Sequence, residues 1–409
     1  MKVCIHRGTE QIGGTCIELS ATGDRIAIDF GLPLDADTGD SSLVPNIAGD
    51  DLRGVVISHP HIDHYGLLHH LTGDVPVAIG SAARRIIQAA APFTGQPLPK
   101  LDGYDLTHGQ PINIGAFRIT PYLVDHSAYD AYALLIEVEG RRLFYSGDFR
   151  GHGRNAGRFE QLLASPPENI DVLFMEGSSL SHFDGDGDFS TEAQLEEEIT
   201  AHLNSADGMV LFHTSAQNID RVVSLYRACQ RSGRPLVIDL YTAAILAATG
   251  NPAVPQSDWP GIHLFLPKAQ AGQVKENQWF SLLTQHSANR IYREQLQKIG
   301  RQAVILFRPL MMTDLDEASC LEGASFIFSQ WAGYLERGVY ASMEVWLKNR
   351  GIKMHHIHTS GHASPNDLKR FAKALAPRAL VPIHSFAPER FGEMFDSVSP
   401  RRDGEWWQV

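Results

Sequence analysis

The feature that most constrains the fold of this chain is a series of short apolar segments, each leading into a histidine or a carboxylate. Segments such as "RGVVIS", "FRITPYLVD" and "RRLFYSG" are rich in β-branched and aromatic residues and stand between Gly, Pro, Asp or Ser, which is typical of β-strands. The first of them runs into "SHPHIDHYG", which packs three histidines and an aspartate into six positions. Ligands of open α/β proteins lie just past the carboxyl ends of strands. This pattern therefore predicts a metal site.

The same placement recurs along the chain, and it selects these candidates: His59, His61, Asp63, His64, His126, Asp148, Glu176, His362 and His384. In a tight loop the side chains at i and i+2 can converge, so His59 and His61 form a natural pair, while Asp63 and His64 project toward a second site. Two metal ions roughly 3.5 to 4 Å apart can clamp both the attacking and the leaving oxygen of a displacement at phosphorus. Zinc suits this mixture of nitrogen and oxygen ligands.

Length and composition narrow the class of protein. A chain of 409 residues predicts two domains. The formal net charge of -12 argues against coating nucleic acid through the whole surface, because such binding depends on phosphate neutralisation. We find no apolar run long enough for a membrane span, no signal-peptide core, and four isolated cysteines without metal or redox spacing. These features predict a cytoplasmic protein with no membrane partner.

The pattern of elements changes near residue 190. The early strands follow one another closely, which indicates stacked sheets of mixed pairing. Strands then alternate with helices, as in "GMVLFH" followed by "SAQNIDRVVSLYRACQRSG" with Ser215 as the N-cap, and this alternation is typical of a parallel α/β domain. The segments "IKMHHIHTSGH" and "RALVPIH" return to strands that end in histidine. We therefore predict one domain over residues 1–188 and 349–409 and an inserted domain over 189–348.

These motifs resemble those of a known superfamily. "HPHIDH" is similar to the HxHxDH motif of the metallo-β-lactamase fold, and His126, Asp148 and His384 match its later ligands in order. Glu176, His362 in "SGHAS" and His384 in "PIH" resemble motifs A, B and C of its β-CASP nuclease branch, which includes ribonuclease J. The resemblance implies an α/β fold, namely an αββα metallo-β-lactamase sandwich with an inserted β-CASP-like parallel α/β domain.

The resemblance also implies a role for each motif residue. His59, His61 and His126 would hold one zinc ion. Asp63, His64 and His384 would hold the other, with Asp148 bridging the two, and Mn²⁺ is an alternative metal. A hydroxide carried by the two ions would attack the phosphodiester. His362 would protonate the leaving oxygen or stabilise the charge on the phosphate, Glu176 would orient it, and Asp63 joins both in the predicted catalytic set.

Substrate contacts are predicted from the residues beside these motifs. Arg150 and Arg154 follow Asp148 and would neutralise backbone phosphates at the rim of the site. A second group, Ser360, Gly361 and Ser364, would form a phosphate cradle with the amides that open the next helix, because a helix N-terminus presents N–H donors.

Together these patterns predict a zinc-dependent hydrolase that cleaves single-stranded nucleic acid, RNA ahead of DNA, from an end or internally. One alternative is a small-molecule metallo-hydrolase of the same fold, acting on a thioester, a lactone or a nucleotide, but it leaves the inserted domain and His362 without a purpose. Another is a catalytically silent binding subunit, although such members typically lose zinc ligands. A homodimer stays open.

Overall fold

The computed structural model describes the chain except for residues 35, 37–39, 48, 50 and 182–186. It divides into two compact units. The first unit comprises Met1–Ala91, Gln96–Phe189 and Ser360–Val409, and the second comprises Pro92–Gly95 and Ser190–Thr359. Across the described residues, no helix combines the length and the apolar character that a membrane crossing needs.

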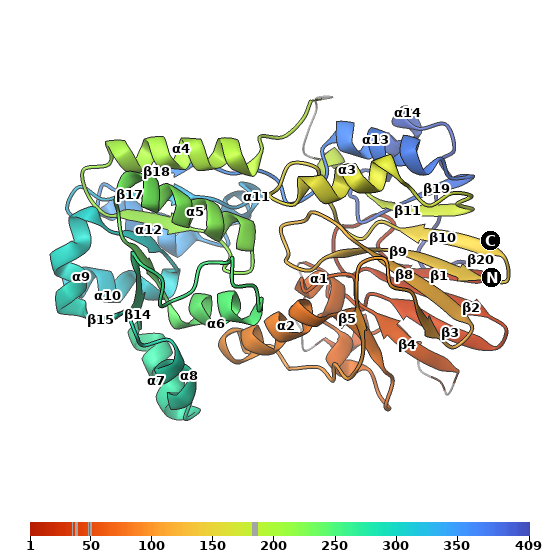
Figure 1. The fold of residues 1–409 in the computed structure, drawn as a ribbon, viewed down its shortest axis with the longest axis horizontal. Coiled ribbons are helices and arrows are strands. Elements are labelled where there is room, and N and C mark those ends of the chain that lie inside the picture. Colours follow the sequence, from red (N-terminus) through yellow and green to blue (C-terminus); the bar gives the residue numbers. More distant parts are fainter. Residues whose placement is uncertain (35, 37–39, 48, 50, 182–186) are drawn as a thin grey trace. The chain divides into compact units, whose positions relative to one another are not determined.

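The first unit contains two facing β-sheets. The first sheet has the order β20 (Trp406–Gln408), β1 (Lys2–Arg7), β2 (Cys16–Ala21), β3 (Asp24–Ile28), β4 (Leu52–Val56), β5 (Val77–Gly80) and β6 (Gly103–Leu106). The second has the order β19 (Ala379–Ile383), β11 (Val172–Glu176), β10 (Arg141–Tyr145), β9 (Tyr132–Val138), β8 (Phe117–Leu123) and β7 (Ile112–Ile114). Pairing is mixed, since β1, β2 and β3 are antiparallel while β3 to β6 are parallel. The two chain ends lie side by side where β20 pairs with β1 (Figure 1).

Alternating apolar residues bind the layers of this unit together. Residues such as Ile26 and Leu134 from the two sheets share one core, because the period of two points every second side chain inward. On the outer face of the first sheet lies α2 (Ser81–Thr94), and on that of the second lie α3 (Ala156–Ala164) and α13 (Pro365–Leu375) (Figure 1). This αββα order confirms the predicted sandwich.

The return segment completes the second sheet at its edge. Strand β19 pairs with β11 in parallel, with Ile383 opposite Glu176. Because parallel strands end at the same edge of a sheet, the residue after β19 lies beside the end of β11. Two residues that are about 200 positions apart in sequence, Glu176 and His384, are thereby brought to one edge.

The second unit is built on a parallel sheet. Its order is β15 (Arg290–Ile291), β14 (Ile262–Phe265), β13 (Leu236–Ile238), β16 (Val304–Leu306), β12 (Val210–His213), β17 (Ser325–Phe328) and β18 (Lys353–His356). The helices are α4 (Glu192–Ser205), α5 (Ile219–Ser232), α6 (Leu240–Ala248), α7 (Lys268–Glu276), α8 (Phe280–Gln285), α9 (Arg293–Ile299), α10 (Met312–Ala318), α11 (Gly333–Glu336) and α12 (Ala341–Asn349). Helices α9, α10 and α12 pack against the strands in one apolar core. This architecture is the predicted inserted parallel α/β domain.

Two details differ from the sequence-based expectations. Strand β18 pairs with β17, with Lys353 opposite Ser325, so the second unit extends to Thr359 rather than ending at residue 348. The boundary predicted at residue 348 falls earlier because the histidines in "KMHHIH" resemble the strand ends of the first unit. The N-cap of α5 is Asn218, whose side chain accepts from the amide of Arg221, and not Ser215.

Candidate active site

The "HPHIDH" loop runs from β4 through the short helix α1 (Ile62–Tyr65) and is held tightly. The amide of His64 donates to the carbonyl of His61 at 2.9 Å. The chain also passes close to Gly31, where an added Cβ would lie 1.8 Å from the carbonyl oxygen of Asp63. Only a residue without a side chain fits there, so the backbone of Gly31 fixes the position of the loop.

His59, His61 and His126 form the first cluster. Each offers a ring nitrogen, and these atoms lie within 4.8 Å of one another. Burial lowers the pKa of His61 to about 4 and lowers the pKa of His59 and His126 well below the usual value. Because a histidine ligates through the lone pair of its neutral ring, these three are ready to bind a metal ion near neutral pH.

Asp63, His64, Asp148 and His384 form the second cluster. Asp148 Oδ2 lies 3.2 Å from His64 Nε2 and 3.5 Å from His384 Nε2. It also lies 3.7 Å from His59 Nε2 in the first cluster. One carboxylate oxygen thus faces both clusters, which is the arrangement that a bridging ligand requires.

The donor atoms of both clusters fit zinc. His59 Nε2, His64 Nε2, His384 Nε2 and Asp148 Oδ2 are buried and make no hydrogen bond within the described residues. Buried polar atoms are rarely left unsatisfied, so their convergence indicates a ligand. Donors at about 2.0–2.2 Å from a tetrahedral ion stand roughly 3.3 to 3.6 Å apart, close to the spacings around Asp148 Oδ2. The set of nitrogen and carboxylate donors is one that zinc favours.

Asp29, at the end of β3, is a site residue that sequence reasoning missed. It is fully buried, lies 2.7 Å from His64 Nδ1 and accepts from the amide of Ser58 at 2.7 Å. Its φ of 57° is left-handed, a conformation that a non-glycine residue adopts at some cost in energy. A carboxylate behind a ligating histidine fixes its tautomer and orientation. The sequence does contain a signal for Asp29, because "RIAIDFG" is also an apolar strand that leads into a carboxylate.

The carboxylates around His64 dominate its electrostatics. Burial alone would lower the pKa of His64, but Asp148 and Asp29 outweigh it and raise the pKa well above the usual value. Conversely, burial would raise the pKa of Asp148, yet the His384 and His64 rings hold it well below the usual range. A metal ion at Nε2 can take the place of the proton that this environment favours, since ligand binding and protonation compete for the same nitrogen.

His362 pairs with Glu176 beside the second cluster. Glu176 is 1% exposed and accepts from the amides of Phe149 and Ser178, each at 3.1 Å. His362 Nδ1 lies 3.2 Å from Glu176 Oε2 and 3.7 Å from Asp148 Oδ2. Burial would lower the pKa of His362, but Glu176 and Asp148 raise it to about 9. The side chain is 27% exposed, so a ligand can reach this protonated ring.

Arg150 requires a correction. It was predicted at the rim of the site as a phosphate contact, but its side chain is fully buried. Its Nε lies 3.4 Å from Asp125 Oδ1, and its Nη1 donates to the carbonyl of Ser360 at 3.1 Å. The sequence could not indicate this burial, because the partner carboxylate comes from a different loop. Arg150 is thus a structural partner of that loop rather than a surface cation.

The predicted phosphate cradle also changes. Ser364 is fully buried and caps α13 by accepting from the amide of Asp367 at 3.1 Å, and Pro365 at the first helical position has no N–H. Ser360 Oγ accepts from the amide of His362 at 3.0 Å. These groups shape the loop instead of presenting free donors. Arg154 is half-buried, and its phosphate contact stays a prediction.

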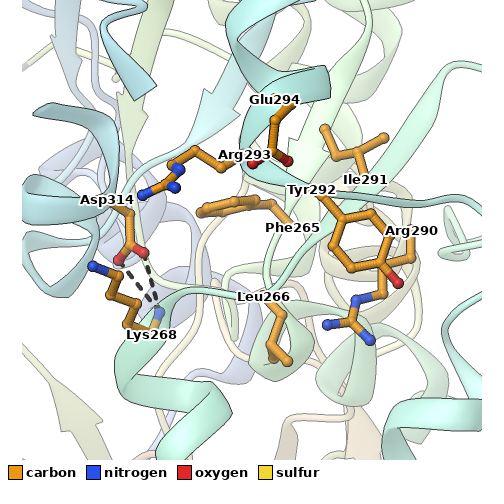
Figure 2. Close-up of a pocket in the computed structure, with 9 residues that line it drawn as sticks. All are labelled: Phe265, Leu266, Lys268, Arg290, Ile291, Tyr292, Arg293, Glu294 and Asp314. Atoms are coloured by element: carbon orange, nitrogen blue, oxygen red, sulfur yellow. Dashed lines mark hydrogen bonds between the residues drawn. The ribbon is translucent and has the colours of Figure 1, made fainter. Parts of the chain in front are cut away.

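A cavity of about 280 Å³ lies in the second unit at the ends of β14 and β15. Figure 2 shows Lys268 facing Asp314 on one side and Arg290 beside the ring of Tyr292 on the other. Asp314 accepts from the amide of Lys268 at the start of α7, while the Lys268 and Arg293 side chains share Glu317. Groups of the protein thus bind three of the five charged side chains that line the cavity, namely Lys268, Arg293 and Asp314.

Comparisons with known proteins agree with this geometry. Residues 40–214 match the family described as a β-lactamase superfamily domain, and residues 350–385 match the Zn-dependent metallo-hydrolase RNA specificity domain. The second match contains His362 and His384. The chain is thus similar to metallo-hydrolases of the β-lactamase superfamily over these two segments.

Among its curated relatives the chain is similar to ribonucleases J. It is 21% identical to that of Sinorhizobium meliloti, over 82% of this chain and 58% of the relative. For Helicobacter pylori ribonuclease J the identity is 22%, over 94% and 56%, and for that of Mycobacterium tuberculosis it is 23%, over 94% and 68%. The chain thus spans less than three-fifths of the length of the first two. The matches agree with the predicted resemblance to ribonucleases J.

A solved structure supports the fold over the whole chain. A protein of unknown function from Enterococcus faecalis V583 superposes with a TM-score of 0.79 at 22% identity, covering 99% of both chains.

Proposed function

We propose that this protein is a zinc-dependent nuclease that hydrolyses phosphodiester bonds of single-stranded nucleic acid, with RNA preferred to DNA. The observation that carries the proposal is the pairing of His362 with Glu176 beside Asp148. A metal site alone serves many hydrolases. A protonated histidine that faces the site is needed when the leaving group is a strongly basic alkoxide, as it is in nucleic acid.

The two clusters would each hold one metal ion. The first ion would be held by His59, His61 and His126, and the second by Asp63, His64 and His384. Asp148 would contribute to both sites. Bound there, the ions supply Lewis acidity and bring the pKa of water close to neutral. Glu176 keeps the proton on Nδ1 of His362 and so directs Nε2 to deliver its proton to the leaving oxygen. We place the protein in the cytoplasm with RNA as its partner.

The test is cleavage by the zinc-loaded protein of end-labelled single-stranded RNA, matched DNA, duplex RNA and circular RNA. We expect single-stranded RNA to be cleaved fastest, chelation to abolish cleavage, and zinc or Mn²⁺ to restore it. The circular substrate separates internal cleavage from attack at an end. If none of the nucleic acids is cleaved and a 4-nitrophenyl thioester or a lactone is turned over instead, the protein is a small-molecule metallo-hydrolase.

A further inference from the structure

Two arginines are among the largest fully buried side chains in the part of the chain that the structure describes. They are Arg150 in the first unit and Arg221 in the second, and both are 0% exposed. Charged side chains are almost never fully buried unless they are paired, because removing a charge from water is costly. Each is paired with a buried carboxylate of its own unit, Arg150 with Asp125 and Arg221 with Glu192.

Arg221, on α5, binds several groups of its own unit. It pairs with Glu192, with 3.0 Å between Nη2 and Oε1, and Glu192 is itself 1% exposed. Its Nη1 donates to Ser329 Oγ at 2.6 Å. Its Nη2 donates to the carbonyl of Thr359 at 3.1 Å. Arg221 therefore holds the chain at the last residue of the second unit.

Arg150 holds the next residue in the same way. Its Nη1 donates to the carbonyl of Ser360 at 3.1 Å, and the Nε2 of His152 lies 2.9 Å from the same oxygen. The ion-pair partner Asp125 is fully buried and is fixed by the amide of Gly153 at 2.7 Å. Asp125 precedes the candidate ligand His126, and Arg150 follows the candidate ligand Asp148 by two positions. The pair thus ties the Ser360 carbonyl to the metal centre.

The held carbonyls lie three and two positions before His362. Ser360 Oγ accepts from the amide of His362, and the amide of Ala363 points at Glu176 Oε1, 3.4 Å away. Between them, Gly361 packs so closely that an added Cβ would lie 2.5 Å from Ser127 Oγ. The segment from Thr359 to Ala363 is consequently fixed at each residue.

We propose that Arg150 and Arg221 are positioning residues that hold the consecutive carbonyls of Ser360 and Thr359 and thereby fix the loop that presents His362. The inference rests on the proposed function, because it takes His362 as the acid for the leaving oxygen. It assigns both arginines an effect on proton delivery and no direct contact with substrate.

The experiment compares two phosphodiesters. Single-stranded RNA needs a proton on its leaving oxygen, whereas the nitrophenolate of bis(4-nitrophenyl) phosphate leaves without one. For Arg150→Lys we expect kcat on RNA to fall about 10²-fold with KM within about twofold, and hydrolysis of the nitrophenyl ester to change less than about threefold. Arg221→Lys follows the same pattern, with a fall of about tenfold on RNA because it acts one residue further from His362. Zinc content stays at the wild-type value in both.

The matched control is Arg231→Lys, on the same helix as Arg221. Arg231 is 43% exposed and pairs with Glu197, so its replacement leaves both reactions unchanged. If Arg150→Lys does not fold, as judged by circular dichroism, His152→Leu can be used instead, because it removes the other donor to the Ser360 carbonyl. We expect a smaller fall in kcat on RNA for this variant, again with little change in hydrolysis of the nitrophenyl ester. Equal losses on both substrates, or no loss on either, would overturn the assignment.

Hydrogen exchange of residues 359–363 separates this inference from the proposed function, because it needs no activity. We expect faster exchange there in Arg150→Lys and Arg221→Lys than in wild type. If exchange rises as expected but wild type cleaves no RNA, the proposed function fails and the loop assignment stands. If wild type cleaves RNA but exchange is unchanged, the assignment of the arginines fails alone.

Discussion

Polar residues follow the strands in both units, but they are satisfied in different ways. In the first unit, Asp148 Oδ2 and the Nε2 atoms of His64 and His384 face one another without a hydrogen bond among the described residues. In the second unit, Asp239 follows β13 and is equally buried, yet its Oδ2 accepts from Gln270 at 2.8 Å and from Arg308 at 2.7 Å. Its Oδ1 caps α6 by accepting from Thr242.

The hydrogen bonding of the buried polar atoms distinguishes a candidate ligand site from a structural cluster. A buried carboxylate whose oxygens are all occupied stabilises the fold and has nothing left to offer a ligand. Buried ligand atoms that converge without hydrogen-bond partners have lost their hydration. A bound ion or substrate offsets this cost in free energy.

The largest effect is expected for Asp148→Asn, which removes the charge that both clusters share. Zinc content should fall below the wild-type value, and kcat on RNA by about 10⁴-fold, because a bound ion supplies several kcal/mol and each 1.4 kcal/mol or so is tenfold. Elemental analysis and RNA cleavage measure the two effects. A variant with full zinc and nearly full activity would contradict the bridging role.

A smaller effect is expected for Glu176→Gln, which removes the carboxylate that raises the pKa of His362. The pKa of His362 then falls, so the acid loses its proton at lower pH. The alkaline limb of the kcat profile should move to lower pH, with kcat near neutral pH reduced about 10²-fold. Steady-state cleavage measured across pH tests this shift. An alkaline limb that stays in place would separate Glu176 from the acid.

For Asp29→Asn we expect a change in metal binding. Asp29 fixes His64 from behind and does not touch the second cluster's ligand nitrogen, so zinc affinity should fall about 10- to 100-fold while saturated activity changes less. Competition with a coloured chelator gives the affinity. Unchanged affinity would show that His64 needs no orienting partner.

The least effect on activity is expected for Asp239→Asn, although the fold should be weakened. Loss of the charge leaves Arg308, which is 16% exposed, without its partner, so stability should fall by about 2 kcal/mol, below the range for a fully buried pair. Denaturant unfolding measures this change. Zinc content and kcat should equal those of wild type, and a loss of zinc would erase the distinction between the two regions.

Local patterns were sufficient to predict stacked sheets of mixed pairing, a parallel α/β insertion and which residues gather at the strand ends, whereas the αββα sandwich came from the resemblance. The period-two strands and the residues that follow them depend on neighbouring positions only, so "GVVIS" before His59 already indicates where that ligand falls. The resemblance to the β-CASP branch supplied the pairing of Glu176 with His362.

What the sequence did not reveal depends on contacts between distant segments. Arg150 looks like a rim cation until Asp125 and the Ser360 carbonyl surround it. Asp29 becomes a site residue only because β3 and β4 lie side by side and bring it to His64. The second unit extends past residue 348 because β18 pairs with β17, and the sequence of β18 does not indicate this pairing.

The most direct test of the account is the rate at which His362→Ala cleaves single-stranded RNA, relative to wild type at equal zinc content. If the metal centre and the acid act together, zinc content is unchanged and kcat falls about 10²- to 10⁴-fold, the range for general acid catalysis. A variant that keeps both its zinc and the wild-type rate would contradict the assignment of His362 and the nuclease mechanism built on it.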